Sequence, residues 1–139
     1  MKPDHDMQLA CVPPDRVAEV WPHVRHFFVK ACKRGRMQTF KTLEDSILDG
    51  QRMLWLATDG HAIHAAAATE IHQTEWEKHL VIVACGGVEM RKWLWILDGI
   101  EAYGRAEGCD AVRLIGRKGW ARALPNYRCT RVVLERRLK

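Results

Sequence analysis

The sequence predicts a single domain of the α/β class, built on a mixed β-sheet with helices on both faces. A length of 139 residues fits one domain, and 47% hydrophobic with 28% charged residues is ordinary globular usage. Predicted strands and helices follow one another in the order β-α-α-β-β-β-α-β-α-β. The continuous apolar run at residues 80–84 is typical of a central strand covered on both faces. We therefore expect residues 1–139 to form one domain, in which strand 80–84 is parallel to strand 111–115.

The first third of the chain predicts one strand and two helices. Residues 8–12 form a short strand that ends at a pair of prolines. From Asp15 to about Lys33 apolar residues recur every three or four positions, which indicates a helix, and Pro22 predicts a kink or a fresh start within it. Thr42 is the predicted cap of a second helix, which ends at Gly50.

The middle of the chain predicts a three-stranded meander followed by a helix. Strands at residues 53–57 and 62–71 are joined by a hairpin turn at Asp59-Gly60. The strand at 80–84 comes next, and Cys85-Gly86-Gly87 is expected to break it. The helix that follows has one apolar face, made by Trp93, Ile96, Leu97, Ile100 and Tyr103.

The last third predicts strand, helix and strand. Gly108 ends the preceding helix, and residues 111–115 form an apolar strand. A short helix at 119–124 is stopped by Pro125, and residues 130–138 are expected to form the final strand of the sheet.

The net charge of +5 belongs to the C-terminal quarter. From Arg105 to Lys139 there are ten Lys or Arg against three acids, whereas the preceding 104 residues carry a net charge of −2. An anionic partner should therefore meet this quarter, whether nucleic acid, a membrane surface or a phosphorylated small molecule. No apolar run reaches the ~18 residues of a membrane span. Five widely spaced cysteines fit reduced thiols in a cytoplasm.

The junction around residues 83–91 is the first candidate site, because a central strand there opens through two glycines into a helix. Gly86 and Gly87 remove side chains that would block a ligand, and the amide groups of a helix start favour phosphate. The alternative is that the two glycines only turn the chain.

The order of elements over nearly the whole chain resembles the GNAT acetyltransferase superfamily. Its members bind acetyl-CoA at this strand–loop–helix junction, where the fourth strand and the next parallel strand splay apart. Residues 54–60 (LWLATDG) with 65–71 (AAAATEI), and residues 108–110 (GCD) with 116–125 (GRKGWARALP), are similar to small GNAT-like proteins of phages and prophages.

The resemblance implies an N-acetyltransferase that moves an acetyl group from acetyl-CoA to a primary amine by direct transfer. It is compatible with a homodimer. Glu70 is implied as the general base, the alternative being a solvated surface carboxylate. Tyr127 is implied as the proton donor to the departing thiolate, the alternative being a packing role in the core. The implied coenzyme A contacts are Ala84, Cys85, Gly86, Gly87, Val88, Met90, Arg91, Arg117 and Arg122.

The chain departs from the superfamily at two points. Its usual loop Q/R-x-x-G-x-G/A is replaced by CGGVEMR at residues 85–91, which brings Glu89 to the pyrophosphate position and Arg91 beside it. The helix at 119–124 lacks the tyrosine of many members, and Tyr127 follows it instead. These departures motivate an alternative, a non-catalytic GNAT-fold module, phage-associated, that acts through protein or nucleic-acid contacts.

Other candidate chemistry is weaker. The pairs His23/His26 and His61/His64 lack a third ligand, so no metal is expected. Nucleic acid is disfavoured as a partner because Trp120 alone stands among the basic residues as a stacking platform.

Overall fold

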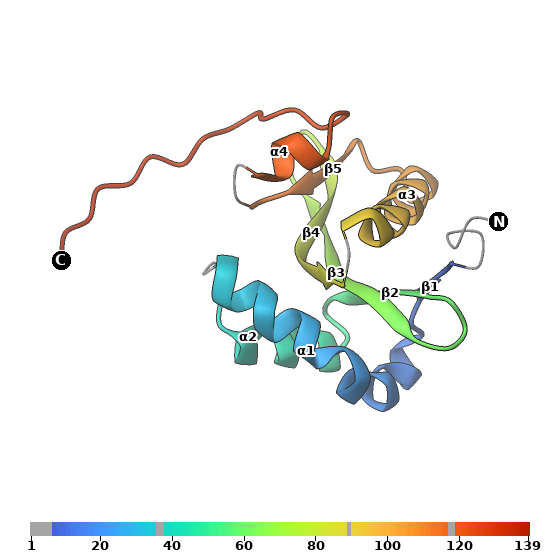
Figure 1. The fold of residues 1–139 in the computed structure, drawn as a ribbon. Coiled ribbons are helices and arrows are strands. Elements are labelled where there is room, and N and C mark those ends of the chain that lie inside the picture. Colours follow the sequence, from blue (N-terminus) through green and yellow to red (C-terminus); the bar gives the residue numbers. More distant parts are fainter. Residues whose placement is uncertain (1–6, 36–37, 89, 117–118) are drawn as a thin grey trace.

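The sheet has five strands, with antiparallel pairing from β1 to β4 and parallel pairing between β4 and β5 (Figure 1). The computed structural model describes residues 7–35, 38–88, 90–116 and 119–139. Along the sheet the strands are β1 (Gln8–Cys11), β2 (Met53–Thr58), β3 (Ile63–Gln73), β4 (Lys78–Gly87) and β5 (Ala111–Leu114). The mixed sheet and its parallel β4–β5 pair confirm the predicted fold class.

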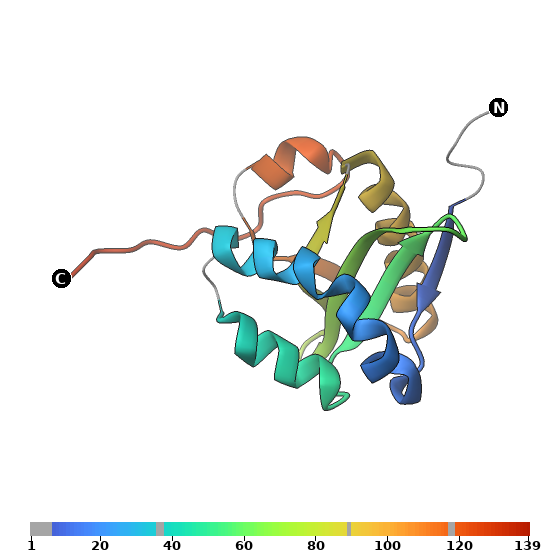
Figure 2. The ribbon, with the colours of Figure 1, turned by 60° about the horizontal axis from the view of Figure 1, so that its bottom comes forward.

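Helices cover both faces of this sheet (Figure 2). They are α1 (Val17–Gly35), preceded by the 3-10 turn Pro14–Arg16, then α2 (Phe40–Leu48), α3 (Met90–Ala106) and the short α4 (Gly119–Ala123). The cap of α2 is Thr39, whose hydroxyl oxygen accepts from the amide of Thr42 at 3.2 Å. The prediction of Thr42 as the cap is therefore wrong by one turn, because Thr39 already provides the first capping oxygen.

Two apolar cores lie on the two faces of the sheet. Val24, Phe28, Leu43 and Ile47 of α1 and α2 are fully buried against one face, and Ile96 and Ile100 of α3 against the other. Four consecutive alanines of β3, residues 65–68, are fully buried and alternate between the two cores. Their small side chains let helices pack closely on both sides of the strand.

Strand β4 does not break at Cys85, which corrects the prediction. Cys85, Gly86 and Gly87 continue the ladder opposite Ala67, Ala66 and Ala65 of β3. The antiparallel partner strand extends far enough to hold this segment, so the chain leaves the sheet only after Gly87.

The expected final strand at residues 130–138 is absent from the sheet in the described part of the chain. Residues 128–139 are extended and run away from the body of the protein (Figure 1). The prediction failed because the residues of a segment favour extended backbone without determining which strand edge it pairs with.

The β2–β3 hairpin confirms the predicted turn at Asp59-Gly60. Gly60 has a φ of 91°, and the Asp59 carboxylate accepts from the amides of His61 and Ala62 at 2.8 Å each. Its second oxygen lies 2.7 Å from Nε2 of His64. The hydrogen bond to His64, followed by those from the two amides, lowers the pKa of Asp59 far below its usual range.

Gly86→Ala should destabilise the fold because an added Cβ would lie 2.8 Å from the Phe27 carbonyl oxygen, a backbone atom of α1. Overpacking of this kind costs about 1–3 kcal/mol. Gly104→Ala is the matched control, since the nearest atom there is Leu80 Cδ2 at 3.5 Å. In urea unfolding, Gly86→Ala should lower the free energy of unfolding, and Gly104→Ala should leave it unchanged or raise it by up to about 1 kcal/mol. Equal stabilities for wild type and Gly86→Ala would refute the packing account.

Asp59→Asn should lower stability at neutral pH and progressively less in acid. A carboxyl whose pKa is depressed by folding stabilises the protein above its unfolded pKa, about 3.9, and loses that contribution as the pH falls toward the folded pKa. The difference in urea midpoint between wild type and Asp59→Asn should therefore narrow as pH is lowered from about 5 toward 2. A difference that stays constant over this range would show that the charge of Asp59 has no part in the turn.

Candidate functional site

The sheet opens between β4 and β5. Their parallel pairing joins His79–Ile82 to Ala111–Leu114, and no pair beyond Ile82 and Leu114 occurs in the described segments. At the same place the β3–β4 register shifts, since Ala68 pairs with Ala84 but Thr69 pairs with Ile82. Val83 is thus an extra residue in β4, and a bulge of this kind bends and twists its strand. From Val83 to Gly87 the side of β4 that faces away from β3 borders the gap.

A polar side chain satisfies the backbone at this bulge. Nε2 of Gln38, in the connection between α1 and α2, donates to the carbonyl oxygen of Val83 at 3.1 Å. Oε1 of Gln38 in turn accepts from Arg52 at 2.7 Å. The bulge is therefore tied to the segment before α2 and to the start of β2.

Glu70 belongs to the same network. Nε and Nη2 of Arg52 lie 3.4 and 3.5 Å from its two carboxylate oxygens, and Nε2 of His72 lies 2.9 Å from Oε1. The side chains of Arg52 and Glu70 are only 17% and 25% exposed, so the ion pair is largely shielded from water. Glu70 is thus connected to the bulge through two intervening side chains, Arg52 and Gln38.

Gly86 and Gly87 have packing reasons to lack a side chain. Gly86 lies against the backbone of Phe27, and a Cβ on Gly87 would lie 2.9 Å from Ala65 Cβ and 3.1 Å from the His64 carbonyl oxygen. Neither glycine adopts a positive φ. Close approach of α1 and β3 explains both positions, so clearance for a ligand is not needed to account for them.

Val88 marks the end of β4. Its amide donates to the carbonyl of His64 at 2.9 Å, which means that this N–H is already used within the fold. Its side chain is 67% exposed and precedes the first turn of α3. Amide groups in the first turn of a helix lack partners within the helix and favour anions.

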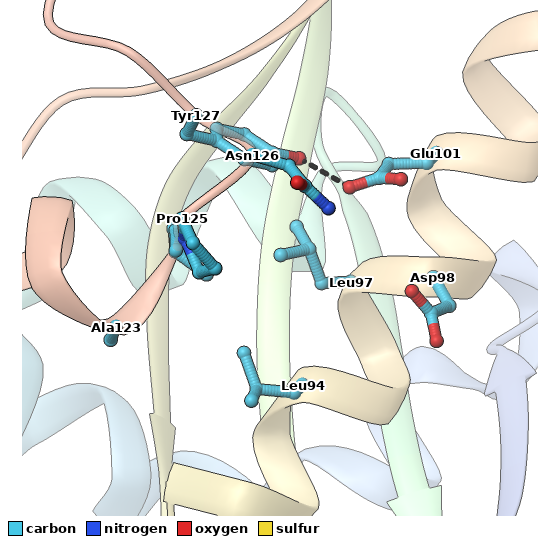
Figure 3. A pocket seen from close by; sticks show the side chains of 9 residues that line it. Leu94, Leu97, Asp98, Glu101, Ala123, Pro125, Asn126 and Tyr127 are labelled. Carbon is cyan, nitrogen blue, oxygen red and sulfur yellow. Dashed lines mark hydrogen bonds between the residues drawn. The ribbon is translucent and has the colours of Figure 1, made fainter.

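A pocket of about 300 Å³ lies on the α3 face of the sheet, between α3 and the segment that follows α4 (Figure 3). Its walls combine apolar and acidic groups: Leu94, Leu97, Asp98 and Glu101 from α3, then Ala123, Leu124, Pro125, Asn126 and Tyr127. Both charged side chains of the lining, Asp98 and Glu101, are on the α3 side and give that wall a negative charge.

Tyr127 is held in this pocket by a carboxylate. Its hydroxyl donates to Oε2 of Glu101 at 2.8 Å, as the dashed line in Figure 3 shows. Burial of the phenol raises the pKa of Tyr127 well above its usual range, and the hydrogen bond and charge of Glu101 act in the same direction. Tyr127 is therefore a weak acid whose proton is directed at Glu101.

The predicted site residues fall into three groups. Ala84 to Val88 lie in sequence along β4 and its end, beside the gap, and Arg122 is exposed on α4. Glu70 lies on the α1–α2 face of the sheet, whereas Tyr127 packs with the core on the α3 face. The gap between β4 and β5 is the part of the sheet through which one ligand can approach residues of both faces.

Several predicted residues lie outside the described part of the structure. These are Arg117 and Glu89, together with the side chains of Met90 and Arg91, whose backbone begins α3.

Four residues of the site were not predicted from the sequence. Gln38 and Arg52 are isolated polar residues in connecting segments, and no periodic pattern marks them. Asp98 and Glu101 carry a weak signal, since they lie beside the apolar face of α3 on the turns that α4 covers. Among the described residues no group of three His, Cys, Asp or Glu is placed to hold a metal ion, and no helix is long and apolar enough to cross a membrane.

Comparison with known proteins gives matches in structure but not in sequence. No family model matches the chain, and no curated protein matches it. An aminoglycoside acetyltransferase from an uncultured soil metagenomic sample, solved with sisomicin, has a TM-score of 0.72 at 10% identity, over 99% of this chain and 100% of that one.

Two further solved structures extend the comparison. A predicted acetyltransferase from Clostridium acetobutylicum, solved with acetyl-CoA, has a TM-score of 0.64 at 11% identity, over 95% of this chain and 96% of that one. The ribosomal-protein-alanine N-acetyltransferase of Brucella melitensis biovar Abortus 2308 has a TM-score of 0.66 at 8% identity, over 96% of this chain and 99% of that one. Because these similarities run over almost the whole length of each chain, the protein has the fold of the GNAT acyl-CoA N-acyltransferases.

Proposed function

We propose that the protein is an N-acetyltransferase that transfers an acetyl group from acetyl-CoA to a primary amine. The observation that supports this most strongly is the bulge at Val83, where β4 parts from β5 in a fold shared with acetyltransferases. A gap in a sheet exposes backbone donors and acceptors along an otherwise buried strand. Such an edge suits an extended ligand that itself carries amide groups, as the pantetheine arm of coenzyme A does.

The residues at the end of β4 fit the phosphate end of the same ligand. Val88 is exposed at the junction, and the first turn of α3 follows it with the anion-binding polarity of a helix start. Arg122 on α4 adds an exposed positive charge, and the basic C-terminal quarter favours an anionic ligand in general. We propose Ala84, Cys85, Gly86, Gly87 and Val88 as the contact strand, with Met90, Arg91, Arg117 and Arg122 as the phosphate side.

In this reaction the protein must position two reactants and transfer two protons. The amine nitrogen bonds to the thioester carbonyl carbon, the carbon–sulfur bond breaks, and the thiolate takes up a proton. Positioning supplies much of the rate in such a transfer, and backbone amides beside the bulge can polarise the carbonyl. We propose Glu70 as acceptor of the amine proton, directly or through a water, with Arg52 fixing its orientation. Tyr127 is the proposed proton source for sulfur, with Glu101 fixing its hydroxyl.

Two further proposals concern the compartment in which the protein works and its relationship to phage proteins. None of the cysteines in the described part of the chain is joined in a disulfide, which favours a reducing cytoplasm. A relationship to phage or prophage proteins is proposed from the two sequence segments at residues 54–71 and 108–125.

A second candidate function is a non-catalytic binding module with the same fold. It is favoured by the engagement of both proposed catalytic groups, because Glu70 is paired with Arg52 and His72, and the Tyr127 hydroxyl is committed to Glu101. In this alternative the gap binds a ligand or a partner without turnover.

Calorimetric titration with acetyl-CoA tests the proposed coenzyme A site, with opposite charges placed at one exposed position. Val88→Asp should weaken acetyl-CoA at least about tenfold by repelling its phosphates, whereas Val88→Lys, equally exposed, should bind as well as wild type or better. Both variants should retain the wild-type circular dichroism spectrum. The absence of binding to wild type at millimolar acetyl-CoA would rule out the acetyltransferase.

Turnover is followed by release of the coenzyme A thiol with a panel of primary amines. Glu70→Gln should keep its affinity for acetyl-CoA and lose about 10²–10⁴-fold in kcat. Binding without thiol release from any amine would favour the non-catalytic module.

A further inference from the structure

We propose that the amine acceptor carries a carboxylate and that Arg113 of β5 binds this carboxylate. The inference rests on the proposed function and extends it, because it names the class of acceptor. Two observations carry it. Arg113 shares a face of the sheet with Glu70, and within the described residues no carboxylate forms an ion pair with its guanidinium.

Glu70 and Arg113 lie on the two strands that flank β4. Val81 of β4 pairs with Glu70 in the β3 ladder and with Arg113 in the β5 ladder. Residues paired across neighbouring strands project from the same face of a sheet. Because neighbouring strands lie about 4.8 Å apart, the Cα atoms of Glu70 and Arg113 are roughly 10 Å apart. A carboxylate and a guanidinium therefore stand on either side of Val81.

Both charged side chains extend toward the same pair of histidines. Oε1 of Glu70 lies 2.9 Å from Nε2 of His72, and Nη2 of Arg113 lies 3.0 Å from Nε2 of His79. His72 and His79 are directly opposite one another in the β3–β4 ladder. The Cβ atoms of such a pair are about 4.5–5.5 Å apart. The carboxylate of Glu70 and the guanidinium of Arg113 therefore converge over β4, close enough for one small ligand to reach both.

The guanidinium of Arg113 is partly buried and short of hydrogen-bond acceptors. Nε2 of His79 also lies 2.6 Å from Oε2 of Glu77, which is the shorter of its two contacts. A ring nitrogen either donates a proton or accepts one, so it cannot serve Glu77 and Arg113 at the same time. With the ring proton directed at Glu77, the guanidinium has no acceptor among the described residues. A shielded cation in this state is stabilised by an added oxyanion.

The oxyanion that fits Arg113 belongs to the acceptor and not to coenzyme A. Arg113 directly precedes Leu114, where the pairing of β5 with β4 ends, so it lies at the closed end of the gap. The proposed phosphate contacts, at Val88 and the first turn of α3, lie beyond the other end of β4. At about 3.3 Å per residue of strand, they are roughly 20 Å from Arg113. The acceptor amine, in contrast, must come close to Glu70, which converges with Arg113.

A carboxylate matches this cation better than a phosphate does. The planar guanidinium donates two parallel hydrogen bonds to the two oxygens of a carboxylate, and one charge balances the other. A phosphate monoester carries close to two negative charges. Arg52, another cation of this face, is already paired with Glu70 and does not supply the second positive charge. The acceptor that fits is therefore an amino acid or a similar short amine, with its amine at Glu70 and its carboxylate at Arg113.

The test compares acceptors that differ in charge, with release of the coenzyme A thiol as the measure of acetylation. The probes are glycine, β-alanine and γ-aminobutyrate, each beside its neutral carboxamide. For the best of these, wild type should have a kcat/KM at least about tenfold higher for the carboxylate than for the carboxamide. Arg113→Gln should remove this preference and leave the carboxamide unaffected, and Arg113→Lys should restore part of it. Arg16→Gln, which removes an exposed guanidinium after β1, is the matched control and should behave as wild type.

Binding is measured separately, so that failure of this inference differs from failure of the proposed function. The Nε–Hε resonance of Arg113 in the ¹⁵N-labelled chain, identified by its loss in Arg113→Gln, should shift with the same carboxylates and not with their carboxamides. That shift without acetylation of any amine would support the carboxylate site and contradict the transferase. Acetylation with no preference for the carboxylates, or with a preference that Arg113→Gln retains, would overturn the inference and leave the transferase standing. A higher kcat/KM for phosphoethanolamine than for every carboxylate would overturn the choice of carboxylate.

Discussion

Strand β4 is held along one side by nine residue pairs with β3 and along the other by only four residue pairs with β5. The extra residue Val83 sits where the second ladder ends, and it turns the rest of β4 away from β5. The direction in which the chain enters α3 and the gap itself both follow from this change in pairing. A regular β4 would keep β5 alongside and leave no opening in the sheet.

A partly buried bulge, packed against the α1–α2 core, is stable only if its backbone groups find partners. Gln38 provides one for the Val83 carbonyl, and Arg52 holds Gln38 in place while pairing with Glu70. An unsatisfied buried carbonyl would cost about 1–3 kcal/mol, so this network has a structural reason to exist without any chemistry. The network also links the carboxylate of Glu70, through Arg52 and Gln38, to the bulge beside the gap. The same side chains can therefore stabilise the fold and, in the reaction proposed above, fix the orientation of Glu70.

Features set by local sequence were predicted well. The Asp59-Gly60 turn, the central run at 80–84 and the apolar face of α3 depend on residues close together in the chain, and the described residues of all three are placed as predicted. The side chain of Trp93, also predicted for that face, lies outside the described residues. Contacts between distant segments were not predictable in the same way. Gly86 is required by the backbone of Phe27 in α1, and the cap of the bulge comes from Gln38, so neither has a signal in its own neighbourhood. The segment at 130–138 was predicted as a strand from its own residues, but it is unpaired in the described structure. Pairing depends on which strand edge lies beside the segment, and its own sequence does not specify that edge.

The central claim is that the gap beside Val83 binds acetyl-CoA along β4. Titration of the ¹⁵N-labelled chain with acetyl-CoA, followed through its backbone amide resonances, tests this claim residue by residue. The largest shifts are expected at residues 83–88, with smaller ones in the first turn of α3 and almost none in β1 and β2. Saturating acetyl-CoA that leaves residues 83–88 unshifted, or that shifts only another surface, would contradict the account.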